Sequence, residues 1–190
     1  MLLLLSAITL AFTACNEEES IQVEVPGNVT GESALLSISI AGKTDGNTHT
    51  RATGNEGIDE SKVNNGIIYI FDGSGNVVKK EFLKTADFTA NVATKTVATT
   101  TAAQSVSVLL NVGIVDSTTL AGTKYDVPTR NQLEALTTTL TNETTGIALQ
   151  QNDNLIMSGT STTPITFSGT PKSGTSNVIV SRIASRVKVY

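Results

Sequence analysis

The sequence predicts a mainly β protein, folded as one β-sandwich or barrel-like domain with one or two short helices. Its 190 residues are enough for one such domain. The chain holds 30 threonines but no tryptophan, and aromatic residues make up only 4% of it. β-Branched residues pack well on a pleated sheet and poorly in helices. Several segments also alternate apolar and polar residues with the period of a strand. The core must therefore be built from valine, isoleucine, leucine and alanine.

The first expected strand covers residues 33–41, which read SALLSISIA. Ser37 and Ser39 fall on one face of this segment. The other face carries the apolar side chains of Ala34, Leu36, Ile38 and Ile40. Such alternation is typical of a half-buried strand, with its apolar side turned to the core.

A β-hairpin is expected next. Five apolar residues in succession, Ile67 to Phe71, predict that residues 63–71 form a central strand buried on both faces. The tetrapeptide Asp72-Gly73-Ser74-Gly75 has the composition of a tight turn. Residues 77–83 then return as the partner strand. Weaker or shorter apolar patterns predict further strands at 88–101, 105–112, 155–159, 165–167 and 178–190.

One helix is indicated after Pro128. Thr129 and Gln132 have the spacing of a capping box, which satisfies free backbone N–H groups at a helix start. Leu133, Leu136 and Leu140 follow at helical spacing, on the face that we expect to pack against the sheet.

The chain begins with a segment typical of export. Residues 1–14 read MLLLLSAITLAFTA, which has the length of a signal-peptide core and is too short to span a bilayer as a helix. The small residues before Cys15 resemble a bacterial lipobox, in which the cysteine is lipidated and becomes the first residue. An ordinary signal peptide with an incidental cysteine, or a buried apolar strand, is the alternative. Residues 16–31 are polar and read as a tether.

A glycine-rich loop is expected at residues 42–57, which show no apolar periodicity. Exposed loops of this kind are the usual sites of proteolysis. Arg51 lies in its middle, followed by Ala52, and Lys43 is a second candidate for cleavage by a trypsin-like protease. The alternative for Arg51 is a solvated loop side chain without a function.

Catalysis and nucleic-acid binding are not expected. The net charge is −4 and the sequence has no basic cluster, which disfavours a nucleic-acid partner. Cys15 is the one cysteine and His49 the one histidine, so neither a disulfide framework nor a cysteine–histidine zinc cluster can form within the chain. No nucleophile motif, phosphate-binding loop or dinucleotide fingerprint is present. We therefore expect no enzyme, no cofactor and no metal.

Several of these features, taken in order, resemble the fimbrillins of Bacteroidales, the FimA-like major subunits of type V pili. They are the lipobox at Cys15, Thr50-Arg51-Ala52 ahead of Asp59-Glu60-Ser61-Lys62-Val63, the strand ending Phe71-Asp72-Gly73, Leu136 to Leu140 ahead of Leu155 to Gly159, and the arginine-containing segment Val180 to Val187. The acidic run Glu17 to Glu19 is similar to the surface-export signal of Bacteroidetes lipoproteins.

The resemblance implies a role for each of these sites. Cys15 would be the lipidation site of an outer-membrane precursor, and an arginine-specific protease would cut after Arg51 to leave Ala52 as the mature N-terminus. The strand with Leu36, Ile38 and Ile40 would be removed by that cut. Residues 1–14 would then be the lipoprotein signal peptide and residues 15–51 the tether and removable strand. Residues 52–190 would form a transthyretin-like N-terminal fimbrillin domain, with the C-terminal domain that donates a strand missing or truncated.

The expected function is therefore a structural subunit of a cell-surface fimbria, polymerised with other subunits by strand exchange after cleavage. The alternative is a monomeric surface lipoprotein that binds glycans or serves as a tip or anchor adhesin. Glycan binders usually present aromatic platforms, and the absence of tryptophan counts against this alternative. An extracellular hydrolase is disfavoured by the missing nucleophile–histidine pair.

Overall fold

The computed structural model describes residues 30–42, 63–89, 92–136 and 156–182. Its elements in chain order are β1 (Ser33–Gly42), β2 (Asn65–Phe71), β3 (Val77–Lys84), the 3₁₀ helix η1 (Thr85–Asp87), β4 (Phe88–Thr89), β5 (Val92–Thr100), β6 (Ser105–Leu110), α1 (Ser117–Leu120), α2 (Arg130–Glu134), β7 (Met157–Thr160) and β8 (Lys172–Arg182). The predicted mainly β fold with short helices is confirmed. No helix in these ranges is long and apolar enough to cross a membrane.

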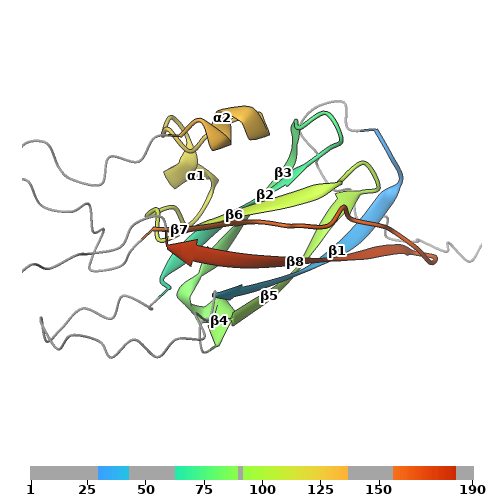
Figure 1. Cartoon of the computed structure of the whole chain (residues 1–190), viewed down its shortest axis with the longest axis horizontal. Helices are drawn as coiled ribbons and strands as arrows, with labels where there is room; N and C mark the ends of the chain where they lie inside the picture. The colour runs from blue at the N-terminus through green and yellow to red at the C-terminus, as the bar shows by residue number, and fades with distance from the viewer. Residues whose placement is uncertain (1–29, 43–62, 90–91, 137–155, 183–190) are drawn as a thin grey trace, which may run out of the picture.

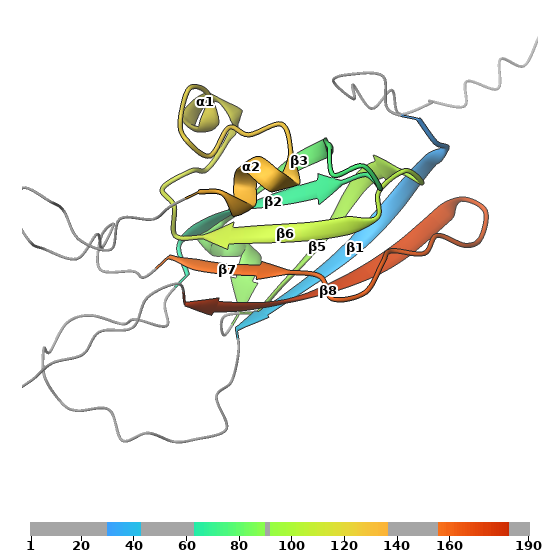
Figure 2. The same ribbon diagram turned by 45° about the horizontal axis from the view of Figure 1, so that its top comes forward.

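All the strands belong to one sheet that bends round on itself into a nearly closed, sandwich-like barrel. Their order across the sheet is β3-β2-β6-β7-β8-β1-β5-β4. Figure 2 shows β1 and β5 crossing behind β2 and β6. Because the two halves of the sheet face each other, apolar side chains from both meet in one core, which includes Leu36, Ile68, Val97, Val108 and Val178.

A second apolar cluster lies on the outer face of β2 and β6, beneath α1 and α2 (Figure 1). From the sheet it receives Ile67, Tyr69, Phe71 and Leu109, and from the covering segment it receives Leu120 and Leu133, among others. A strand with a core on each side must be apolar on both faces. The uninterrupted run of apolar residues in β2 is therefore buried on both faces, as the sequence predicts.

The β2–β3 hairpin forms as expected, and its turn is organised by one carboxylate. Asp72 accepts hydrogen bonds at Oδ1 from the backbone N–H groups of Ser74 and Asn76, at 2.9 and 2.8 Å. Gly75 has a φ of 82°, a conformation that side chains disfavour. In this part of the sequence, the turn residues and the apolar strands thus both predict the hairpin that the structure contains.

The predicted helix is present but shorter than its leucine spacing indicates. The Thr129 side chain accepts a hydrogen bond from the N–H of Gln132, as the capping pattern predicts, but α2 ends at Glu134. Leu133 is buried and Leu136, beyond the helix end, is partly buried in the second cluster. Leu140 lies outside the described residues. The preceding helix α1, with Asp116 as its N-cap, was not predicted.

The prediction of a strand at residues 165–167 is wrong. Ile165 donates one backbone hydrogen bond to the carbonyl of Gln104, and only Ser168 forms an isolated bridge, with Ser173. Residues 165–167 therefore form no regular ladder of hydrogen bonds with a neighbouring strand.

The last strand begins earlier than predicted, at Lys172 instead of residue 178, and residues 183–190 lie outside the described part. Residues 172–177 are polar or glycine, so they lack the apolar pattern of a strand, and at Gly174 the ring of Phe167 lies where a side chain would be. A Cβ on Gly174 would lie 2.9 Å from Cδ1 of Phe167.

Candidate functional site

The candidate site is the position of β1 inside the sheet. β1 pairs antiparallel with β5 from Ser33 to Ala41 and parallel with β8 from Ala34 to Gly42. It therefore has a neighbour along both edges for almost its whole length, and it separates two strands that do not pair with each other. Figure 1 shows β1 running between β5 and β8.

The inner face of β1 is fully covered. Leu36, Ile38 and Ile40 have no solvent exposure, and they belong to the first core. On the outer face Leu35 is 45% exposed, while Ser37 and Ser39 are half-buried. The predicted alternation of an apolar face and a polar face is confirmed, with Leu35 as an apolar residue on the outer side.

The flanking strands line the space around these three side chains, here called the β1 groove. At either end of the groove the neighbours are small or apolar. Leu36 lies in register between Val97 of β5 and Gly174 of β8, and Ile40 lies between Ala93 of β5 and Val178 of β8. These ends offer an incoming side chain only van der Waals contact and apolar burial.

The middle of the groove is polar on both sides. Ile38 lies in register between Lys95 of β5 and Ser176 of β8. The ammonium of Lys95 pairs with the carboxylate of Asp87 at 3.5 Å. The hydroxyl of Ser176 is buried and has no hydrogen-bond partner among the described residues.

The entry to β1 is held by hydrogen bonds to the end of β5. Glu32 donates its N–H to the Thr101 hydroxyl at 3.0 Å and accepts the N–H of Thr101 at its carbonyl at 2.9 Å. The Thr100 hydroxyl donates to the carbonyl of Thr30 at 3.2 Å. The start of the strand is thus fixed, and its other end leads into residues 43–62.

The predicted site residues have different outcomes. The structure brings Leu36, Ile38 and Ile40 together on one buried face, and their removal by cleavage remains a prediction. Cys15, Arg51 and Ala52 lie outside the described residues, so their predicted roles remain predictions. Lys95 and Ser176 were missed. They reach the groove through pairings between distant segments, and no local pattern in the sequence indicates those pairings.

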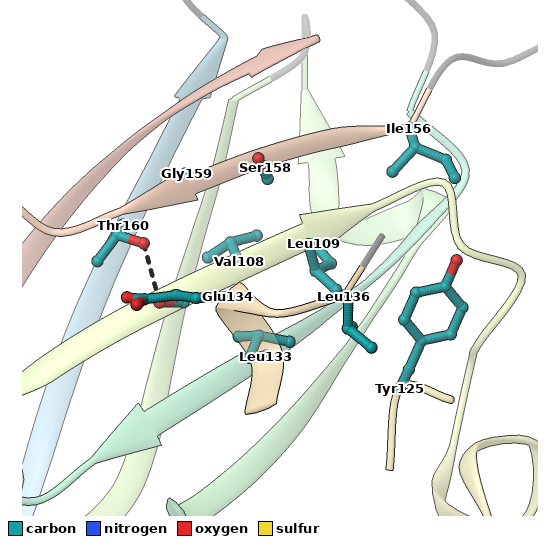
Figure 3. A pocket seen from close by; sticks show the side chains of 11 residues that line it. Val108, Leu109, Tyr125, Leu133, Glu134, Leu136, Ile156, Ser158, Gly159 and Thr160 are labelled. Carbon is teal, nitrogen blue, oxygen red and sulfur yellow. Dashed lines mark hydrogen bonds between the residues drawn. The ribbon is translucent and has the colours of Figure 1, made fainter. Parts of the chain in front are cut away.

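A cavity of about 180 Å³ lies between α2 and the outer face of β6 and β7. Figure 3 shows Leu133, Glu134 and Tyr125 on its helical side. On the sheet side the hydroxyls of Ser107 and Thr160 share a hydrogen bond of 2.9 Å. Pockets for organic ligands usually exceed about 300 Å³, so this cavity is small for a glycan. No cluster of acidic, histidine or cysteine side chains in the described ranges could hold a metal ion.

The solved structures that are similar to this chain in fold include the following two. A protein of Bacteroides eggerthii named for a role in cell adhesion is 27% identical, with a TM-score of 0.58 over 81% of this chain and 41% of that one. The tip fimbrial protein Mfa3 of Porphyromonas gingivalis, with a C-terminal truncation, has a TM-score of 0.50 at 12% identity, over 80% of this chain and 49% of that one. At that identity the second comparison shows the fold alone. The chain spans less than half the length of either protein.

No curated protein sequence matches this chain. The profile of the family described as "Major fimbrial subunit protein (FimA)" matches residues 34–190, from the second residue of β1 onward. That match covers most of the chain and includes every strand of the sheet, so the chain belongs to the FimA family of major fimbrial subunit proteins.

Proposed function

We propose that this chain is the N-terminal part of a structural, non-enzymatic subunit of a cell-surface fimbria, and that it assembles by exchange of β1 for a strand of another subunit. Membership of a fimbrial family supports the fimbrial role and a location at the cell surface. The position of β1 supports the exchange. It is an internal strand near the start of the chain, and a glycine-rich segment with an arginine follows it directly.

The proposed order of events begins with export. Residues 1–14 direct the precursor out of the cytoplasm, and lipidation of Cys15 anchors it to the outer membrane, with residues 16–31 as a tether. An arginine-specific protease then cuts after Arg51, and Ala52 becomes the new N-terminus. After that cut β1 is held by non-covalent contacts only, and a neighbouring subunit can replace it.

The burial of β1 is the observation that carries this proposal. Covering Leu36, Ile38 and Ile40 contributes roughly 4.5–9 kcal/mol, at about 1.5–3 kcal/mol for each side chain. A whole domain is stable by only about 5–15 kcal/mol. Loss of β1 would also leave the facing backbone edges of β5 and β8 without partners, and such edges are templates for another strand. The domain therefore needs a strand in this position, either its own or a neighbour's.

The test uses the precursor made with its complete C-terminal part. It is treated with an arginine-specific protease, and then N-terminal sequencing and electron microscopy follow. The unmodified protein should yield Ala52 as the new N-terminus and then fibres. Arg51→Ala should remain an uncleaved, folded monomer. Lys43→Ala is the matched control, which removes the nearby basic residue and should assemble normally. Fibres of normal length from Arg51→Ala would refute the proposal.

Lipid attachment has its own test. Cells that express the precursor are grown with an alkyne analogue of palmitate, and the purified protein is examined for the label. The unmodified chain should carry the label and Cys15→Ser should carry none. Equal labelling of both would show that Cys15 is not the lipidation site, without affecting the strand-exchange part of the proposal.

A further inference from the structure

The middle of the β1 groove contains a polar group that the resident strand does not satisfy. Ser176 is only 5% exposed, and its hydroxyl has no hydrogen-bond partner among the described residues. It is in register with Ile38 on β1, and both side chains are buried on the inner face of the sheet. An isoleucine side chain has no donor or acceptor, so Ile38 leaves this hydroxyl unpaired.

Lys95, the other polar neighbour of Ile38, differs in this respect. Its ammonium lies 3.5 Å from a carboxylate oxygen of Asp87, and both side chains are nearly a third exposed. Lys95 is therefore paired and partly hydrated whatever strand fills the groove. Of the two polar side chains in register with Ile38, only Ser176 depends on the strand in the groove for a partner.

An unpaired buried hydroxyl destabilises the state that contains it, typically by about a factor of ten in the equilibrium constant. A strand that places its own hydroxyl beside Ser176 removes this penalty, because each hydroxyl can donate to or accept from the other. β1 is thus a less favourable occupant of its groove than a strand of similar shape with a hydroxyl at the central position. Such an arrangement makes β1 easier to replace in a protein that must later release this strand.

We propose that Ser176 selects the strand that replaces β1, and that the preferred strand carries threonine or serine at the position now held by Ile38. This inference rests on the proposed function, since it names the partner of the same groove. The occupant is an extended segment of another subunit, with apolar side chains at the two positions that match Leu36 and Ile40 and a hydroxyl between them. The groove then recognises one polar side chain in the otherwise apolar row that the incoming strand presents.

The first arm of the test needs no exchange. Threonine and valine side chains have nearly the same shape, so Ile38→Thr and Ile38→Val differ mainly in the hydroxyl. Each substitution is made in the otherwise unmodified chain and together with Ser176→Ala. Equilibrium unfolding in urea is measured for all four proteins. In each background, the folding equilibrium constant of the valine variant is divided by that of the threonine variant. This ratio should be about fivefold smaller in the chain with Ser176 than in the chain with Ser176→Ala. An equal ratio in both backgrounds would overturn the inference.

The second arm measures selection directly. The chain is cut at Arg51, and two synthetic peptides of residues 30–42, one with Ile38→Thr and one with Ile38→Val, are added in equal excess. Mass spectrometry then measures which peptide the protein retains. The ratio of threonine to valine peptide should be about fivefold higher for the unmodified chain than for Ser176→Ala.

The outcomes of the second arm separate the two proposals. Exchange with the same peptide ratio in both proteins would overturn the selection by Ser176 and leave strand exchange intact. If neither peptide enters either protein, the strand-exchange function fails, and the inference that rests on it fails as well. A higher threonine ratio only in the presence of Ser176 supports both.

Discussion

The hydroxyl of Tyr69 donates a hydrogen bond of 2.7 Å to the backbone carbonyl of Tyr125, and this contact joins β2 to the segment that covers it. The Tyr69 side chain has no solvent exposure, and its ring stacks on Phe71 with 6.2 Å between centroids. Burial, together with the nearby charge of Asp126, raises the pKa of the Tyr69 phenol well above its ordinary value. The phenol therefore stays protonated and acts as a permanent donor at the centre of the second apolar cluster.

Tyr69→Phe should destabilise the domain by about 0.5–1.5 kcal/mol, because it removes this hydrogen bond. The carbonyl of Tyr125 keeps a second donor, the backbone N–H of Val127 at 3.0 Å. Urea unfolding followed by circular dichroism measures the change. Tyr125→Phe is the matched control, since it removes a phenol hydroxyl but keeps the accepting carbonyl, and its effect should stay within about 0.5 kcal/mol. A larger loss from the control would mean that the hydroxyl of Tyr125 contributes more to stability than the hydrogen bond to its carbonyl.

The local pattern of the sequence was enough to predict most strands, because each of them contains its own signal. In β1 the alternation of serine with leucine and isoleucine identifies the buried face, and in β2 five apolar residues in succession indicate a core on each side. The hairpin between β2 and β3 was also predictable, since Asp72 and Gly75 form its turn within a few residues.

The groove could be predicted only in part, because its walls come from distant segments. β1 pairs with β8, which lies more than a hundred residues further along the chain, and the pairing is parallel. Residues 172–177 of β8 are mostly polar or glycine, so they gave no signal of a central strand. Without that pairing the sequence cannot place Ser176 beside Ile38. The helix was overestimated for a similar reason, since leucine spacing does not reveal where the chain turns away after Glu134.

Leu36→Ala should destabilise the domain by about 2–5 kcal/mol, because it leaves a cavity in the groove where the side chain is fully buried. Leu35→Ala is the matched control on the same strand. Leu35 is 45% exposed, so the same truncation should cost less than about 1 kcal/mol. Urea unfolding measures both, and equal losses would contradict the assignment of the two faces of β1.

Stability should fall at acid pH in part because of Asp72. Burial of this carboxyl acts to raise its pKa, but hydrogen bonds from Asn76, Ser74 and Gly75 outweigh that effect and hold the pKa below its ordinary value. Since the pKa is lower in the folded state, the contribution is present above the pKa of the unfolded chain, about 3.9. It is lost as the pH falls through the folded-state value.

Asp72→Asn should therefore show a smaller fall in the urea midpoint than the unmodified chain between about pH 5 and pH 2. The Asn76→Ala variant keeps the carboxylate and removes only the amide donor, which reaches Oδ2 at 3.2 Å. An NMR titration of that variant should give an Asp72 pKa closer to the ordinary value. An unchanged titration would mean that the backbone donors alone determine the shift.

Gly159→Ala should unfold the seam between β7 and β8, because the strands approach there more closely than any side chain allows. A Cβ on Gly159 would lie 2.3 Å from the carbonyl oxygen of Ile179, and that oxygen belongs to the backbone of β8 and cannot turn aside. Since β8 is one wall of the groove, displacing it would also loosen β1. We expect a loss of more than about 3 kcal/mol, or no soluble protein.

Gly42→Ala is the control for this substitution, since a Cβ at Gly42 meets nothing within 4 Å. Its effect on the urea midpoint should be small, because it changes chain entropy but creates no overlap. Soluble yield and urea unfolding compare the two variants. If Gly159→Ala were as stable as Gly42→Ala, β7 and β8 would have to separate at no cost, and the groove would lack the rigid wall that strand selection requires.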